Sequence, residues 1–218
     1  MIRELATNYG TMFVPDTDDG QYSWLLNSGG SPEDNFIEEV CGLFKGGCAV
    51  DVGANFGCWT LPLASHAAEV VAYEPQPKVF DMLLQSITAN LIENIYPRNW
   101  AVGDQRGQVM IPDLDIEIAR NFGGIGLIDM HGGPFAQVPM VTLDWHLKHR
   151  PVSFIKIDVE GYEHKVIKGA AEVIRRCRPV LFVEMDHPHT DGTALRLEIE
   201  AMGYVTDKRQ GNYLCMPL

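Results

Sequence analysis

The residues with the clearest chemical potential form a glycine-rich turn that joins an apolar run to an amphipathic segment. The apolar run covers residues 48–52, and the turn reads Asp51-Val52-Gly53-Ala54-Asn55-Phe56-Gly57. This order predicts a strand, a tight turn and a helix. In such a turn Gly53 lets a ligand approach the backbone, and Gly57 permits close packing of the helix on the strand. The helix N-terminus would offer unpaired N–H groups to a negative group of the ligand.

A single acid follows the next predicted strand. Residues 70–73 are apolar and lead into Glu74, where nucleotide-binding α/β folds place a carboxylate that accepts hydrogen bonds from ribose hydroxyls. A dinucleotide fingerprint would need Gly-x-Gly-x-x-Gly to seat a pyrophosphate. Here Asp51 leads the turn, and Asn55 occupies a place where a further glycine often sits. A ligand without a pyrophosphate, such as S-adenosylmethionine, therefore fits better. The competing interpretation is an ordinary Gly-rich turn followed by a solvated acid.

Further acids end two later predicted strands. Asp158 ends the apolar run 154–159, Glu160 follows it, and Glu184 ends the run 179–185. Ligands of open α/β sheets bind outside the carboxyl ends of the strands. We therefore expect these three acids to line an acceptor site, where a general base helps because an aliphatic hydroxyl has a pKa of about 15–16. His187 is a second candidate base. The competing interpretations are a helix-capping role for Glu160 and a solvated loop around His187.

The same strand ends also offer oxygen ligands for a divalent cation. The ligand set would be Asp158, Glu184 and Asp186, which suits Mg²⁺ or Ca²⁺, and such an ion would polarise an acceptor hydroxyl. Clustered acids act equally well without an ion, so a metal is not predicted. The five cysteines are scattered without a Cys-x-x-Cys pair, which indicates neither a zinc site nor a disulfide framework.

The elements that must position these residues alternate between strands and helices. Strands are predicted at 48–52, 70–73, 98–102, 154–159 and 179–185, and helices at 57–65, 77–94, 162–176 and 194–202. A closing hairpin is predicted over 204–217, with its turn at Gln210-Gly211-Asn212. This alternation predicts βαβ units in an α/β fold with a mostly parallel sheet, and one domain over residues 1–218.

Two regions do not follow that alternation. Residues 1–34 form an N-terminal extension with an acidic turn at 16–20, and a helix is predicted next to it at 32–44. Residues 112–137 form a long segment rich in glycine. Because a long loop inside a compact domain is usually functional or disordered, we expect residues 112–137 to cover the acceptor side of the site.

Composition narrows the classes of partner and location. The net charge is −12, which works against nucleic acid and favours a small-molecule or neutral carbohydrate acceptor. The only dense basic cluster, Arg175, Arg176 and Arg178, ends a predicted helix and there complements the helix dipole. Neither a signal peptide nor a membrane span is predicted, so a cytoplasmic protein with reduced thiols is expected. The oligomeric state stays open.

Several segments together resemble the FkbM-type methyltransferase family, over about residues 36–185. The matching segments are 50–57, Ala72-Tyr73-Glu74-Pro75-Gln76-Pro77, Asn99-Trp100-Ala101-Val102-Gly103-Asp104, 141–144 and Ile155-Lys156-Ile157-Asp158-Val159-Glu160-Gly161. The last of these is the most specific, because general methyltransferases do not share it. Residues 1–34 and the Gly-rich segment match only loosely.

The resemblance implies a Rossmann-like class I methyltransferase fold. Such a fold has a mostly parallel seven-stranded sheet, helices on both faces and a C-terminal antiparallel hairpin. It also implies S-adenosylmethionine as the methyl donor and a hydroxyl acceptor on a sugar, a lipid-linked glycan or a secondary metabolite. Pro75 would stand beside Glu74 in the donor site, and Asn99, Trp100 and Ala101 would lie beside the adenine. A buried core position is an equally good interpretation of Trp100.

Alternative functions remain at this point. A nicotinamide-dependent oxidoreductase is disfavoured by the missing third fingerprint glycine. A cofactor-binding module without catalysis is disfavoured by the acids Asp158, Glu160 and Glu184. An N-methyltransferase of a small molecule would use the same donor fold, but the acids favour oxygen, because a hydroxyl depends more than an amine on losing its proton.

Overall fold

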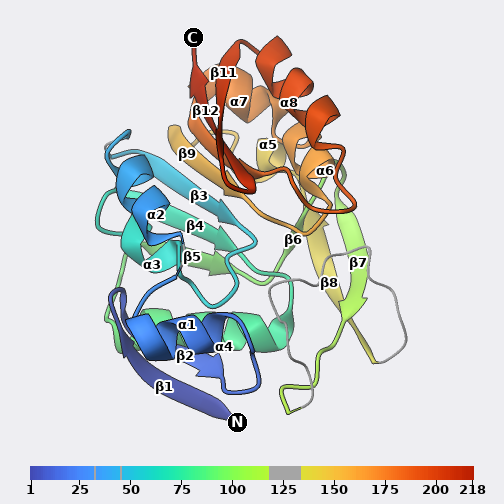
Figure 1. Cartoon of the computed structure of the whole chain (residues 1–218). Coiled ribbons are helices and arrows are strands. Elements are labelled where there is room, and N and C mark those ends of the chain that lie inside the picture. Colours follow the sequence, from blue (N-terminus) through green and yellow to red (C-terminus); the bar gives the residue numbers. More distant parts are fainter. Residues whose placement is uncertain (32, 45, 118–133) are drawn as a thin grey trace.

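The computed structural model describes residues 1–31, 33–44, 46–117 and 134–218, and a seven-stranded sheet lies at its centre (Figure 1). The strand order is β11-β12-β10-β9-β3-β4-β5. The strands are β3 (Cys48–Val52), β4 (Glu69–Tyr73), β5 (Ile95–Arg98), β9 (Val152–Ile157), β10 (Val180–Glu184), β11 (Tyr204–Arg209) and β12 (Asn212–Pro217). Strands β10, β9, β3, β4 and β5 pair in parallel, and β12 and β11 form an antiparallel hairpin at one edge. The predicted Rossmann-like sheet and its hairpin are confirmed.

Helices cover both faces of this sheet, because strand residues alternate between two separate cores. In β3, Ala49 packs in the first core, whereas Val50 packs in the second. The first core is covered by α1 (Gln21–Ser28), α2 (Asp34–Cys41), α3 (Thr60–Leu63) and α4 (Pro77–Ala89). The second is covered by α5 (Leu143–His146), α6 (Glu163–Lys168), α7 (Ala171–Cys177) and α8 (Gly192–Ala201). None of the helices in the described ranges is long and apolar enough to span a bilayer.

Two smaller sheets were not predicted. The hairpin β1 (Ile2–Thr7) and β2 (Gly10–Pro15) occupies the N-terminal extension. Its second strand is fixed to α4 by side chains, since Phe13 N–H donates to Ser86 Oγ and Thr11 N–H donates to Asn90 Oδ1. The other small sheet pairs β8 with β6 in parallel and with β7 in antiparallel orientation. Its strands are β6 (Ala101–Val102), β7 (Gly107–Pro112) and β8 (Phe135–Val141).

The predicted third strand at 98–102 is wrong. Strand β5 ends at Arg98 in the large sheet, and β6 begins at Ala101 in a different sheet. Residues 99 and 100 lie between the two strands, so the chain passes from one sheet to another within the segment that was predicted as a single strand. This difference matters for the site because it separates three residues that the sequence places together.

Two predicted helices are also shorter than expected. The helix expected at 57–65 is reduced to the four residues of α3. The helix expected at 162–176 is divided into α6 and α7 at Gly169. A Cβ on Gly169 would lie 2.0 Å from the carbonyl oxygen of Gly103, so the backbone of the 103–104 turn approaches the helix at this point. The Gly-rich segment 112–137 lies between β7 and β8, and residues 118–133 of it lie outside the described residues.

Candidate functional site

The turn after β3 is held in an unusual backbone shape at the carboxyl end of the sheet. Gly53, Asn55 and Gly57 all have positive φ, at +85°, +50° and +106°. The N–H groups of Gly53 and Ala54 both donate to the carbonyl oxygen of Tyr73, at 3.0 Å each. The segment 51–57, which we call the donor loop, is thereby fixed to the end of β4.

Close contacts explain the two glycines differently from the sequence-based expectation. A Cβ on Gly53 would lie 1.8 Å from the carbonyl oxygen of Asp158, so the backbone that approaches this glycine is the turn after β9. A Cβ on Gly57 would lie 2.9 Å from Leu83 Cδ1 of α4, so this glycine makes room for helix α4. The expected helix N-terminus is also weaker than predicted, because α3 begins only at Thr60 and has four residues.

Glu74 binds the donor loop directly. Its carboxylate accepts the N–H of Asn55 on Oε2 and the N–H of Gln76 on Oε1, both at 2.9 Å. Burial raises the pKa of Glu74 to about 7, while the N–H groups of Gln76 and Asn55 act in the opposite direction. The Asn99 side-chain amide donates to the carbonyl oxygens of Glu74 and Pro75, at 2.9 and 2.8 Å. Asn99 and Pro75 therefore lie next to Glu74, and the place beside the adenine that the family resemblance implies for Asn99 stays a prediction.

The other two residues of the 99–101 segment lie elsewhere. Trp100 packs edge-on against His146 at 5.0 Å between ring centroids and lies 6.4 Å from the Trp145 ring, both on α5. Ala101 is 1% exposed in the core of the small sheet. Within the described residues, Asn99 binds the backbone of Glu74 and Pro75, whereas Trp100 and Ala101 pack elsewhere, because the chain leaves the large sheet directly after Arg98.

Two buried oxygen atoms in the donor loop fit a ligand that brings hydrogen-bond donors. Asp51 is fully buried, and its Oδ2 accepts the hydroxyl of Thr60 at 2.6 Å. Asp51 Oδ1 and Asn55 Oδ1 have no hydrogen-bond partner within the described ranges of the chain. A buried acceptor without a donor costs about 1–3 kcal/mol. S-adenosylmethionine carries an ammonium group and ribose hydroxyls, so its donors match these atoms and the nearby Glu74.

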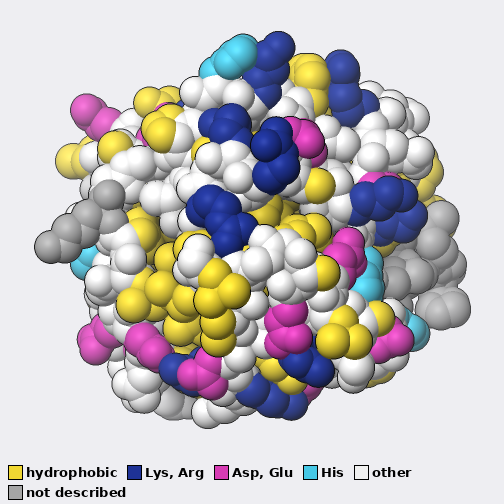
Figure 2. All heavy atoms as spheres, turned by 90° about the horizontal axis from the view of Figure 1, so that it is seen from above, with side chains coloured by type: hydrophobic (Ala, Val, Ile, Leu, Met, Phe, Trp, Pro, Cys, Tyr) yellow, Lys and Arg dark blue, Asp and Glu magenta, His cyan; other side chains and the backbone are white. Residues whose placement is uncertain are grey.

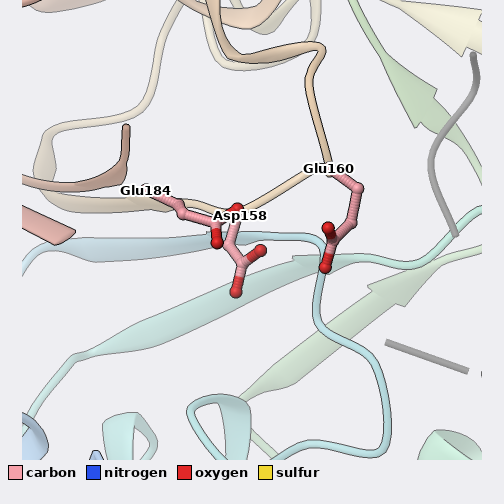
Figure 3. Close-up of side chains that lie close together, drawn as sticks. All are labelled: Asp158, Glu160 and Glu184. Atoms are coloured by element: carbon pink, nitrogen blue, oxygen red, sulfur yellow. The ribbon is translucent and has the colours of Figure 1, made fainter. Parts of the chain in front are cut away.

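Three carboxylates meet on the other side of the donor loop. Asp158 and Glu160 follow β9 and Glu184 ends β10, and each offers an oxygen within 4.8 Å of the others. Figure 3 shows their carboxyl groups turned toward a shared space in front of the turn after β3. The structure thus brings together all three acids that the sequence predicted at these strand ends. Such a set can share a proton or offer oxygen ligands to a divalent cation.

Glu160 is not the capping acid of the helix that follows. The N-cap of α6 is Tyr162, which makes no side-chain cap hydrogen bond, and Glu163 Oε1 instead accepts the N–H groups of Val159 and Gly161 in the preceding turn, at 3.2 and 3.0 Å. Glu160 has a φ of +55° and its Oε2 lies 3.1 Å from His187 Nε2. A non-glycine residue in the left-handed region costs about 1–3 kcal/mol and tends to occur at functional sites.

His187 has no nitrogen left to take a proton from a substrate. Its Nδ1 accepts the backbone N–H of His189 at 3.2 Å, and its Nε2 faces Glu160. The imidazole therefore orients Glu160, and the solvated-loop interpretation applies to His189, which is exposed. Asp186 was named as a ligand only for the case that a metal is bound, and its carboxylate pairs with Lys208 Nζ at 2.7 Å, whereas the group of three acids contains Glu160 in its place.

Glu184 carries its proton more firmly than an ordinary glutamate. Burial, together with the charges of Asp158 and Glu160, raises the pKa of Glu184 to about 9. At neutral pH Glu184 therefore keeps its proton. Glu184 Oε2 is buried and makes no hydrogen bond within the described part of the chain.

Sequence reasoning overlooked two residues at this site. Lys156 is 4% exposed and places its Nζ 3.1 Å from Asp158 Oδ2. Its signal was a lysine inside an otherwise apolar strand, which was noted only as part of the family resemblance. Glu33 accepts the indole N–H of Trp59 at 2.7 Å and the side-chain amide of Asn212 at 3.0 Å. Glu33 gave no local signal, because its partners come from α3 and β12.

A hollow of about 680 Å³ lies at the amino ends of the parallel strands, on the edge of the sheet opposite the three acids. Figure 2, seen from above, shows basic side chains beside a hydrophobic area. Two basic residues of the predicted Arg175–Arg178 cluster line the hollow, but their guanidinium groups bind backbone carbonyls. Arg176 donates to Leu147 and Arg150, and Arg178 donates to Met202 and Gly203. No carboxylate or histidine is among the described lining residues.

The fold and the site define a Rossmann-like protein of the methyltransferase class. A family profile described as the methyltransferase FkbM domain matches residues 51–206, and the chain belongs to this family. No curated protein sequence matches the chain.

Solved structures with a similar fold include three methyltransferases or related proteins. Methyltransferase FkbM from Methylobacillus flagellatus KT has a TM-score of 0.58 at 20% identity, covering 80% of this chain and 45% of that one. An rRNA methylase from Streptococcus thermophilus has a TM-score of 0.51 at 14% identity, covering 84% and 93%. SMU.1697c from Streptococcus mutans, solved in complex with SAH, has a TM-score of 0.50 at 11% identity, covering 84% and 95%. At these identities the likeness establishes the shared fold alone, and this chain spans less than half of the Methylobacillus protein.

The contact at Gly53 leads to a stability prediction. Gly53→Ala should strongly lower the melting temperature, because the new Cβ would meet the Asp158 carbonyl at 1.8 Å. Gly46→Ala is the matched control, since Gly46 also has a positive φ, +63°, but has nothing within 4 Å of a Cβ. The control should lose about 1–2 kcal/mol and Gly53→Ala clearly more. Equal losses in thermal unfolding would contradict the close contact between the two turns.

Proposed function

We propose that residues 1–218 form one S-adenosylmethionine-dependent O-methyltransferase domain, acting on a hydroxyl of a neutral sugar, glycan or secondary metabolite. The observation that carries this proposal is the direct contact between the donor loop at Gly53 and the turn that presents Asp158. A donor bound along the loop would have its reactive end beside the three acids. Methyl transfer is an in-line displacement that depends mainly on such alignment and on the exclusion of water.

Residues of the donor loop would hold the cofactor through its hydrogen-bond donors. Asp51 Oδ1 and Asn55 Oδ1 would accept N–H groups, and the Glu74 carboxylate would accept the ribose hydroxyls. The shape of the loop depends on Gly53, Phe56 and Gly57. The Asn99 side-chain amide stabilises the backbone at Glu74 and Pro75 by donating to their carbonyl oxygens. When bound, S-adenosylmethionine supplies a methyl group activated by its sulfonium.

Asp158 is the proposed general base. During transfer of the methyl group, the Asp158 carboxylate would take the proton of the acceptor hydroxyl. Glu184, which keeps its own proton at neutral pH, donates a hydrogen bond to the acceptor. Glu160, oriented by His187, binds a second acceptor group. Three acids at this place disfavour an anionic acceptor such as a nucleic acid.

Calorimetric titration of the purified chain with S-adenosylhomocysteine, with NAD as the control, tests the donor assignment. We expect micromolar binding of the first compound and none of the second. If S-adenosylhomocysteine binds and NAD does not, the next step is a screen of sugars and polyketide-type compounds as methyl acceptors, with radiolabelled S-adenosylmethionine as the donor. Absent binding, or a preference for NAD, would remove the proposed function.

The raised pKa of Glu74 predicts how this binding depends on pH. An ionised carboxylate accepts two ribose hydroxyls, whereas a protonated one must donate. The pKa of Glu74 in the ligand-free protein is about 7. Because only the ionised form accepts both hydroxyls, affinity for S-adenosylhomocysteine should rise about tenfold from pH 6 to pH 8. The matched variant Glu74→Gln should bind more weakly and lose this pH dependence. A steep dependence that survived in the variant would assign the titration to another group.

Replacement of the proposed base separates chemistry from donor binding. Asp158→Asn should lower turnover by a factor of about 10²–10⁴, the usual contribution of a general base, while affinity for S-adenosylhomocysteine changes less than about threefold. Asp207→Asn is the control, because Asp207 is 63% exposed and pairs with Arg209. Turnover of the two variants and the wild type is compared with an acceptor identified in the screen. Full activity in Asp158→Asn would reject Asp158 as the base.

A further inference from the structure

Lys156 is a buried cation that the proposed chemistry does not yet use. Its side chain is 5% exposed, whereas that of Lys168 on the protein surface is 70% exposed. Burying an ammonium without partners costs several kcal/mol, so its environment must compensate for the lost water. Lys156 lies in the central strand β9, and the β3–β9 register pairs it directly with Asp51.

The partners of this ammonium come from both sides of the site. Lys156 Nζ lies 3.1 Å from Asp158 Oδ2 and 3.4 Å from the carbonyl oxygen of Gly53, and 3.9 Å from Asp51 Oδ1. Burial alone would lower the pKa of Lys156, but Asp158 and Asp51 together raise it above its ordinary value. The side chain is therefore charged, and its charge lies between the donor loop and the proposed base.

We propose that Lys156 is a positioning residue that fixes the donor loop against Asp158. Its ammonium donates one hydrogen bond to the Gly53 peptide and one to the Asp158 carboxylate, so a single side chain sets the distance between donor and acceptor residues. The ammonium thereby engages the Gly53 carbonyl oxygen and Oδ2 of Asp158. This inference rests on the proposed function, because the role of Lys156 assumes that S-adenosylmethionine binds along the donor loop.

The test compares the affinities of variants for S-adenosylhomocysteine, measured by calorimetry at 10 °C. Lys156→Met keeps the length of the side chain and removes its charge. We expect about tenfold to hundredfold weaker binding, the effect of losing a charged hydrogen bond. Lys168→Met is the control for loss of a surface charge and should bind like the wild type. Unchanged affinity in Lys156→Met would overturn the positioning role.

A purely structural role needs its own control. Val173→Ala removes core volume on the opposite face of the sheet and should lower the melting temperature without changing affinity. If Lys156→Met bound no worse than this variant, the role would be structural and the proposal rejected. Lys156→Gln, which keeps an N–H donor without charge, decides the question if the Met variant does not fold, and should bind between the wild type and Lys156→Met. Failure of both variants to fold would also assign Lys156 to the fold rather than to positioning.

The outcomes separate this inference from the proposed function. If the wild-type protein does not bind S-adenosylhomocysteine, the donor site itself is wrong. If the wild type binds and both Lys156 variants bind equally well, the donor site stands and only the role of Lys156 is lost.

Discussion

The meeting of two backbone turns at the carboxyl edge of the large sheet constrains the whole site. A Cβ on Gly53 would lie 1.8 Å from the carbonyl oxygen of Asp158, so no side chain fits between the donor loop and the turn after β9. Because β3 and β9 are parallel neighbours, both turns leave the sheet at the same edge. The contact converts this general property of parallel sheets into a specific arrangement, in which the residues proposed to bind the donor lie beside the residue proposed as the base.

Charge is the second feature that organises the site. Asp51, Asp158 and Glu184 surround one ammonium, that of Lys156, and low-dielectric surroundings make an excess of like charges costly. The molecule reduces this cost by keeping a proton on Glu184. A positively charged ligand would reduce it further. S-adenosylmethionine is a sulfonium cation, so the surplus of acid suits the proposed donor and disfavours an anionic acceptor.

The segment around α2 and the C-terminal hairpin meet next to these charges. Glu33, from the segment before α2, binds Trp59 beside the donor loop and Asn212 in the C-terminal hairpin. Arg209 of the same hairpin forms a double contact with Glu39 of α2, at 3.3 and 3.0 Å. The N-terminal segment and the hairpin thus stabilise each other at the site, although neither belongs to the alternating strand and helix pattern of the central sheet.

The sequence alone was sufficient to locate β3, β4, β9, β10, the C-terminal hairpin and the order of the acids, whereas it misplaced β5. Asp51, Glu74, Asp158 and Glu184 each follow an apolar run, and a parallel sheet brings the ends of such runs to one edge. Local pattern was sufficient there, because burial on both faces of a strand leaves a clear apolar signal. The tertiary structure alone decided which side chains touch. It separated Trp100 and Ala101 from Asn99, gave both nitrogens of His187 to other partners, and placed Lys156 and Glu33 among the acids. These outcomes depend on contacts between residues far apart in the chain, for which spacing along the sequence carries no information.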